Sequence, residues 1–198
     1  MPLEQEAKFI LTDTDTCRAK ILDMGGRSKG RVFETNVCYE DEKNSLAAKK
    51  SILRLRQDRI VRLTYKSPPA RENREVKTMN EIEVSVSDFK AMDQILLAVG
   101  FHPAQTYEKW RETFILDGAE LCLDTMPFGD FLEIESTPDQ VKSISAALGL
   151  PWEKRVLDNY LAIFAMIKEK KALTFTDITF DNFKGIHIDF SQYPVLEP

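Results

Sequence analysis

Near the start of the chain lies the stretch Glu4-Gln5-Glu6-Ala7-Lys8-Phe9-Ile10, in which charged side chains recur at every second position up to Lys8. Successive side chains on a β-strand point to opposite faces, so Glu4, Glu6 and Lys8 share one face. A strand of this kind usually lies half buried, with its charged face in water. Like charges that are neighbours on one face repel each other unless an opposite charge lies between them. The stretch therefore predicts a strand whose charged face needs a partner.

The same alternation recurs along the chain. Period-2 patterns and β-branched or aromatic residues predict eight strands, at residues 3–11, 31–39, 52–58, 60–67, 79–86, 107–116, 119–125 and 130–136. Seven of these strands place charges on one face, often as pairs of like sign: Arg54 with Arg56, Glu81 with Glu83, Lys109 with Arg111, and Glu133 with Glu135. One such pair is weak evidence, but the whole set favours a shared binding site over an ordinary amphipathic sheet.

Helices are expected between the strands and after them. The first covers residues 12–24 and the last covers about 153–171. Between them, one helix is capped by Ser87 and stops before Gly100, and another is capped by Thr137 and ends at Gly149. Eight antiparallel strands can close on themselves, and closure removes the exposed sheet edges. We therefore expect an α+β fold: a closed eight-stranded antiparallel β-barrel with helices packed outside and the charged faces turned into its lumen.

Composition and charge exclude several classes of protein. The 198 residues include 27 Lys and Arg and 32 Asp and Glu, a net charge of −5, whereas a nucleic-acid-binding protein normally carries a basic surplus. No apolar run approaches the ~18 residues that span a bilayer, and the start lacks the pattern of a secretory signal. Cys17, Cys38 and Cys122 are far apart and fit free thiols. We expect a cytoplasmic protein with no nucleic-acid or membrane partner.

The paired charges also indicate what a lumen could bind. Divalent cations would satisfy the carboxylates, and phosphate oxygens would satisfy the arginines and lysines. The alternation therefore predicts a site for a complex of a metal ion with a triphosphate.

At this point the motifs resemble those of the CYTH superfamily, the triphosphate tunnel metalloenzymes. Glu4-x-Glu6-x-Lys8 is similar to the E-x-E-x-K signature of that family. The likeness continues in order, over residues 1 to about 165, through Leu53-Arg54-Leu55-Arg56, Thr64-Tyr65-Lys66, Glu81-x-Glu83, Lys109-x-Arg111, Leu123-Asp124 and Phe131-Leu132-Glu133-Ile134-Glu135. The family includes class IV adenylyl cyclases, thiamine triphosphatases and inorganic tripolyphosphatases, and the stretches leading to Arg54 and Arg111 look most like the cyclase-type members.

Carried over residue by residue, the resemblance implies roles for the charged residues. Mg²⁺ or Mn²⁺ would be bound by Glu4, Glu6, Asp124, Glu133 and Glu135. The triphosphate would be bound by Lys8, Arg54, Arg56, Lys66, Lys109 and Arg111. Lys66, Glu4 and Glu6 are the catalytic candidates, and Glu81, Glu83 and Arg62 would support them. The implied CYTH domain spans residues 1–170, and residues 171–198 form an aromatic-rich extension that packs on it. A homodimer is compatible with this organisation.

Three functions stay open. A class IV adenylyl cyclase-like enzyme would convert ATP to 3′,5′-cyclic AMP and pyrophosphate. A triphosphate hydrolase, acting on tripolyphosphate or thiamine triphosphate, would use the same lining with water as the nucleophile. A non-catalytic module that binds polyphosphate or nucleotides is a third interpretation, which the acidic metal ligands disfavour. Overall resemblance favours the cyclase.

Overall fold

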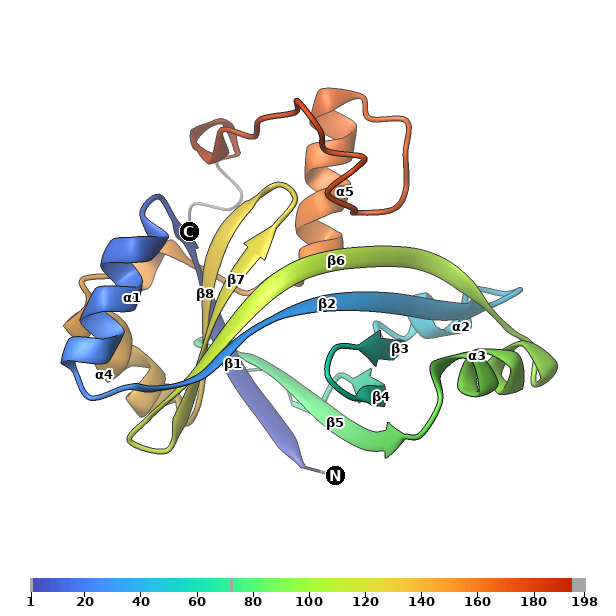
Figure 1. The fold of residues 1–198 in the computed structure, drawn as a ribbon, viewed down its shortest axis with the longest axis horizontal. Coiled ribbons are helices and arrows are strands. Elements are labelled where there is room, and N and C mark those ends of the chain that lie inside the picture. The colour runs from blue at the N-terminus through green and yellow to red at the C-terminus, as the bar shows by residue number, and fades with distance from the viewer. Residues whose placement is uncertain (1, 72, 194–198) are drawn as a thin grey trace.

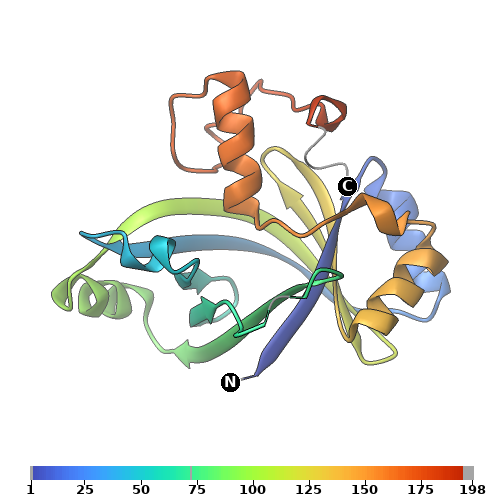
Figure 2. The ribbon, with the colours of Figure 1, turned by 180° about the vertical axis from the view of Figure 1, so that it is seen from behind.

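The strands form one closed antiparallel barrel (Figures 1 and 2). The computed structural model describes residues 2–71 and 73–193. Its strands are β1 (Leu3–Leu11), β2 (Arg27–Asp41), β3 (Ile52–Gln57), β4 (Val61–Ser67), β5 (Lys77–Val86), β6 (Phe101–Leu116), β7 (Ala119–Met126), β8 (Gly129–Glu135) and β9 (Arg155–Val156). Their order is β5-β4-β3-β2-β6-β7-β8-β1-β9, and an additional pairing of β5 with β1 closes the ring. The predicted eight-stranded barrel is confirmed, with β9 as an extra strand beside β1.

Several strands are longer than predicted. β6 begins at Phe101 instead of residue 107, and β5 begins at Lys77 instead of residue 79. The added part of β6 pairs with β2, from Asp41 opposite Phe101 onward. Cross-strand pairing therefore extends the ladder into polar residues whose intrinsic preference for a strand is weak.

The helices lie outside the barrel. They are α1 (Thr14–Asp23), α2 (Ser45–Ala48), α3 (Phe89–Ala98), α4 (Pro138–Leu148) and α5 (Tyr160–Lys171). The short α2 was not predicted, and the cap of α3 is Asp88 rather than Ser87, because the Asp88 carboxylate accepts a hydrogen bond from the Ala91 amide. Within the described residues, no helix has the length and apolar character needed to cross a bilayer.

The predicted helix over residues 153–171 is shorter in the structure. Residues 152–154 form a 3₁₀ turn, and the next two residues pair with β1 as β9. The α-helix then begins at Tyr160, where the Asn159 side chain caps the Ala162 amide. A strand pairing with a distant part of the chain thus overrides the helical periodicity, which is a local property.

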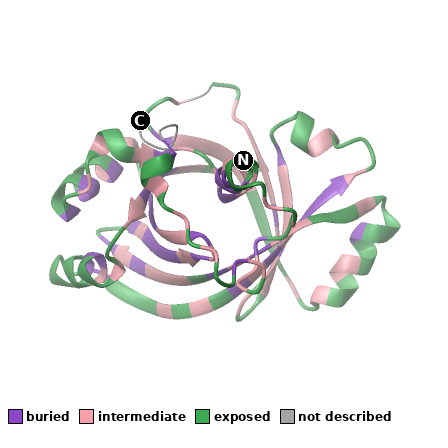
Figure 3. Ribbon diagram, turned by 90° about the horizontal axis from the view of Figure 1, so that it is seen from above, coloured by how far each residue is buried: buried purple, intermediate pink, exposed green. Residues whose placement is uncertain are grey.

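The helices cover different parts of the barrel, with α1 and α4 together on one of them. α1 and α4 pack on the outer faces of β1, β7 and β8, in a core that includes Phe9, Ile21 and Leu132. α3 covers the outer faces of β2, β3 and β4 through Leu55 and Leu96. Burial alternates along part of β2, whereas β1, β7 and β8 have runs of buried residues because both of their faces are covered; Figure 3 shows burial along the ribbon.

The segment after α5 packs back on the barrel. Ile178 forms a parallel bridge with Tyr107 on β6: the Ile178 amide donates to the Thr106 carbonyl at 2.8 Å, and the Glu108 amide donates to the Ile178 carbonyl at 2.9 Å. Phe183 is buried, and its ring contacts the aromatic rings of α5 and of the β7–β8 turn. The segment thereby holds α5 against one end of the barrel; residues 194–198 of the predicted extension lie outside the described part.

Candidate active site

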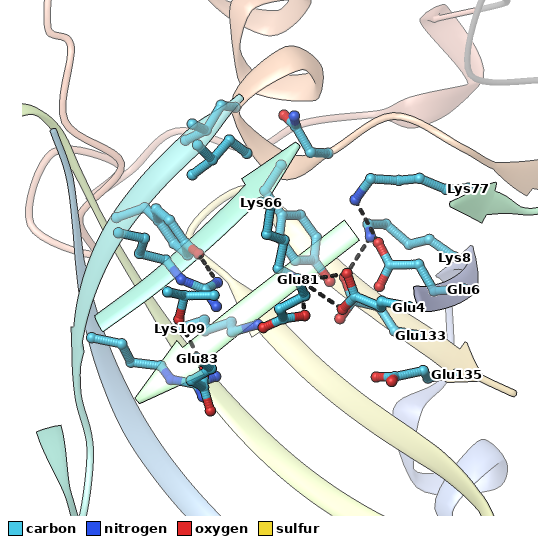
Figure 4. A pocket seen from close by; sticks show the side chains of 18 of the residues that line it. Glu4, Glu6, Lys8, Lys66, Lys77, Glu81, Glu83, Lys109, Glu133 and Glu135 are labelled. Carbon is cyan, nitrogen blue, oxygen red and sulfur yellow. Dashed lines mark hydrogen bonds and ion pairs between the residues drawn. The ribbon is translucent and has the colours of Figure 1, made fainter. Parts of the chain in front are cut away.

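The charged strand faces meet in one cavity of about 290 Å³ inside the barrel (Figure 4). Its basic lining residues are Lys8, Arg54, Arg56, Lys66, Lys77, Lys109 and Arg111. Its acidic lining residues are Glu4, Glu6, Glu81, Glu83, Glu120, Glu133 and Glu135. The cavity thus has seven cations and seven carboxylates among the described residues, so its walls are neutral overall although they are densely charged.

Cross-strand register places opposite charges side by side on β1. Lys8 lies opposite Glu133 on β8, and its ammonium group binds the Glu133 carboxylate. Glu6 accepts a hydrogen bond from Lys77 Nζ at 2.6 Å. Glu4 binds Lys66 Nζ at 2.5 Å. The like charges of the Glu4-x-Glu6 motif are therefore separated by lysines from other strands, as electrostatics requires.

Asp124 is the centre of a buried network behind the cavity wall. It is fully buried, and it accepts hydrogen bonds from Lys109 Nζ at 2.9 Å, Arg111 Nε at 2.7 Å and the Tyr160 hydroxyl at 2.8 Å. Arg111 also binds Glu133. In this arrangement Asp124 fixes the positions of Lys109 and Arg111, two cations that line the cavity. The charge of the buried carboxylate is tolerated because these hydrogen bonds satisfy its lone pairs.

Several buried polar atoms on β2 and β3 have no hydrogen-bond partner among the described residues. These are Oε2 of Glu34, both amide atoms of Asn36, and the Nε atoms of Arg54 and Arg56. A buried donor without a hydrogen bond costs about 1–3 kcal/mol. Arg54 and Arg56 line the cavity, so an anion there would meet two guanidinium groups whose donors the protein does not fully satisfy.

The carboxylates differ in pKa according to their neighbours. Burial raises the pKa of Glu6, but the charges of Lys77 and Lys8 outweigh burial and lower it to about 2. Burial and the nearby charges of Glu4, Glu120 and Glu6 raise the pKa of Glu135 to about 7. Figure 4 shows Glu135 apart from the ion pairs of the other carboxylates. This end of the cavity has more negative charge than the local lysines compensate.

Comparison with known proteins identifies the family. The model of the CYTH domain matches residues 2–148. The chain belongs to the CYTH domain family. A Methanocaldococcus jannaschii protein named as a putative adenylate cyclase is 26% identical to this CYTH chain over 137 residues, which are 68% of this chain and 77% of that protein.

Two solved structures share the CYTH fold of this chain. A Vibrio parahaemolyticus protein named as a putative adenylate cyclase has a TM-score of 0.74 at 17% identity, over 82% of this chain and 98% of the other. A Hippeastrum protein, described as a putative adenylyl cyclase with a dominant triphosphatase activity, has a TM-score of 0.61 at 19% identity, over 82% of this chain and 95% of the other. At these identities the likeness concerns the fold.

The CYTH barrel brings most of the predicted site residues together. All of them line the central cavity except Asp124 and Arg62. Arg62 lines an adjoining cavity of about 350 Å³, which shares Arg56, Glu83, Arg111 and Glu120 with the first. Asp124 lies behind the wall, in the network described above.

Sequence reasoning missed several residues that line the central or the adjoining cavity of this CYTH protein. Lys77 has the same strand parity as Glu81 and Glu83, but the predicted strand began two residues too late to include it. Glu34 lies on the same face of β2 as Asn36 and Cys38, and it is the one charged residue of these three, so no charge pattern indicated it. Tyr160 shared a helical face with apolar residues, and no local feature indicated its contact with Asp124.

The residues of the CYTH cavity fit a divalent metal ion in their chemistry. Carboxylate oxygens are the ligands that Mg²⁺ and Mn²⁺ prefer. The raised pKa of Glu135 and the raised pKa of Glu4, which burial and Glu6 cause, show carboxylates that added positive charge would stabilise. A triphosphate brings several negative charges into walls that are neutral, which also calls for a cation. Among the described residues no three acidic, histidine or cysteine side chains are gathered as a ready metal cage, so we expect side chains to move on binding.

Proposed function

We propose that this chain is a class IV adenylyl cyclase-like enzyme, which binds ATP in the lumen and forms 3′,5′-cyclic AMP and pyrophosphate. The observation that carries the proposal is the cavity inside the barrel, whose lining combines arginines that have unsatisfied Nε donors with carboxylates of raised pKa. Family membership and the named relative from Methanocaldococcus jannaschii support the choice of reaction.

In this reaction the ribose 3′-oxygen forms a bond to the α-phosphorus, and the bond from that phosphorus to the bridging oxygen of pyrophosphate breaks. The proton of the 3′-hydroxyl passes to solvent, and pyrophosphate leaves with the bridging oxygen. Arg54, Arg56 and Arg111 would hold the triphosphate oxygens and neutralise the charge that grows on the leaving group. Lys8 and Lys109, whose positions Glu133 and Asp124 fix, would orient the chain for attack.

Mg²⁺ or Mn²⁺ would be held by Glu4, Glu6, Glu133 and Glu135, and Asp124 could join only after releasing its present partners. When bound, such an ion lowers the pKa of a coordinated hydroxyl and neutralises phosphate charge. Lys66 binds Glu4 and Glu81, and with Glu4 as a metal ligand it would be released to hold a phosphate or a reacting hydroxyl.

A triphosphatase is the second candidate. It would use the same lining, with water instead of the ribose hydroxyl as the nucleophile. It is favoured by the dominant triphosphatase activity of the Hippeastrum protein that shares this fold.

A product assay separates these functions. The protein is incubated with ATP, thiamine triphosphate or tripolyphosphate, each with Mg²⁺ or Mn²⁺, and the products are identified by chromatography. Cyclic AMP with pyrophosphate supports the cyclase, and orthophosphate supports the triphosphatase. Binding of these compounds without any product would leave a binding module and refute both enzymes.

Substitutions at the acidic motif test whether the metal site is placed correctly. We expect Glu4→Gln or Glu6→Gln to lower turnover at least ~100-fold while the protein stays folded, because an amide keeps the size of the side chain but removes the hard anionic ligand. The measurement is turnover against metal concentration. Near-normal activity of both variants at limiting metal would count against these residues as ligands.

A further inference from the structure

The uncharged residues of the cavity lining gather where α5 covers the barrel: Cys38, Ile52, Tyr107, Asn159, Tyr160 and Leu161. Cys38, Tyr107 and Tyr160 are buried in one apolar cluster, and Ile52 and Leu161 pack against it. We call these five residues the α5 patch, beside which Asn159 adds an amide. Inorganic triphosphate has only polar oxygens on its surface, so burying them against apolar side chains would be unfavourable.

The α5 patch adjoins three of the cations that are proposed to bind the triphosphate. Arg54 donates a hydrogen bond to the Tyr107 hydroxyl at 2.8 Å. Lys8 Nζ lies 4.3 Å from the centre of the Tyr160 ring, and Lys109 Nζ lies 5.2 Å from it. A ligand that joins an apolar ring system to a phosphate chain could therefore contact the patch and these cations at once, without crossing a gap.

We propose that the α5 patch binds the base of a nucleoside triphosphate, so that the preferred substrate is a nucleotide rather than inorganic tripolyphosphate. The proposal rests on the proposed function, in which the lumen binds the triphosphate. A base at the α5 patch also determines which way the triphosphate chain runs through the lumen. The first phosphate lies near Arg54, Lys8 and Lys109, and the terminal phosphate points toward Arg56 and the adjoining cavity.

Paired ligands test the proposal. The dissociation constants of ATP and of inorganic tripolyphosphate, each with Mg²⁺, are measured by calorimetry for the parent, Ile52→Ala and Leu161→Ala. Losing apolar contacts to a bound group weakens binding about 10-fold or more. We therefore expect each variant to bind ATP about tenfold more weakly, and to bind tripolyphosphate within about twofold of the parent.

Two control variants remove similar apolar volume outside the cavity. Met166→Ala lies on α5 and packs against the same cluster, and Leu53→Ala lies on β3 with its side chain in the core under α3. Both should bind ATP and tripolyphosphate as the parent does. In a further variant, Leu161→Trp, the larger side chain fills the patch, so ATP binding should fall while tripolyphosphate binding persists and reports an intact lumen.

The outcomes distinguish a failure of the base site from a failure of the triphosphate site. If the patch variants weaken ATP and tripolyphosphate equally, or weaken neither, the base does not bind at the α5 patch, although the triphosphate site stands. If the parent binds neither ligand, the proposed function fails and the base site fails with it. Selective loss of ATP in the patch variants alone supports the inference.

Discussion

Glu135 illustrates how a single residue depends on its neighbours. It lies opposite Glu6 on β1 and opposite Glu120 on β7, so register places three carboxylates side by side. Burial and these charges raise its pKa to about 7, whereas Glu6, on the adjacent strand, has the ammonium group of Lys77 beside it. Two glutamates of one wall thus differ in protonation near neutral pH.

Glu135→Gln should stabilise the ligand-free protein above pH 7. The pKa of Glu135 in the folded protein is raised above its ordinary value of 4.5. Its contribution to the stability of the fold is therefore fully present below pH 4.5 and is lost as the pH rises to about 7. The advantage of the glutamine variant should therefore grow over this range and stay constant above it. Because Glu135 is only partly enclosed, solvent screens its charge, and we expect a gain of only about 1–3 °C in melting temperature. Thermal melts of the parent and the variant at pH 4.5 and pH 8 measure this gain. An equal difference in melting temperature at the two pH values would contradict a raised pKa of Glu135.

Tyr160 and Tyr193 form a matched pair of buried hydroxyl groups. The Tyr160 hydroxyl donates to Asp124, whereas the Tyr193 hydroxyl has no partner among the described residues. We expect Tyr160→Phe to lower the free energy of unfolding by about 1.5–3 kcal/mol, because it removes a hydrogen bond to a charged group. Tyr193→Phe should be neutral or slightly stabilising. Urea denaturation measures both, and equal effects would show that the Asp124 network does not contribute to stability.

At the scale of elements, α5 and the segment after it decide the shape of the site. The start of α5 lines the cavity, where Tyr160 bonds to Asp124 on β7. The position of the helix also depends on β9, which pairs with β1 just before it, and on the aromatic contacts of Phe183 and Phe175 after it. The matched family region ends at residue 148, so these elements lie beyond it.

Phe183→Ala should loosen α5 from the barrel. Phe183 is buried against the rings of Phe128, Phe164 and Phe175, and its truncation should cost about 3–5 kcal/mol of unfolding free energy. Hydrogen exchange of the α5 amides should become faster than that of the barrel strands. Phe180→Ala, a half-buried residue of the same segment, is the control and should leave α5 protected. Unchanged α5 exchange in Phe183→Ala would show that the segment does not hold the helix.

The whole molecule encloses many charges in a small volume. Seven carboxylates and seven cations share a cavity of about 290 Å³, and some buried donors have no partner. A ligand that binds only this folded arrangement stabilises it by mass action.

Tripolyphosphate with Mg²⁺ should therefore raise the melting temperature. At ~100 times the dissociation constant the gain is about 2.7 kcal/mol, which for a chain of this length is roughly 5–10 °C. Arg54→Ala should shrink the shift, because it removes a phosphate donor from the lining. Arg18→Ala, which removes an arginine on the outer helix α1, should keep the full shift. A parent protein with no thermal response would refute a triphosphate site in the lumen.

The alternation of side chains along a strand is a local property of the backbone, and it was sufficient to predict the barrel and its charged faces. The pairs Arg54 with Arg56 and Glu81 with Glu83 were assigned to the lumen on that basis. The ion pairs inside the lumen could not be predicted from the sequence. Lys8 and Glu133, for example, are 125 positions apart and meet only through the register of β1 with β8. The same dependence on distant contacts separates the enclosed Asp124 from the open Glu135, and it places Tyr160 at the end of the cavity. Protonation and access depend on burial and on neighbouring charges, which exist only once the barrel has closed.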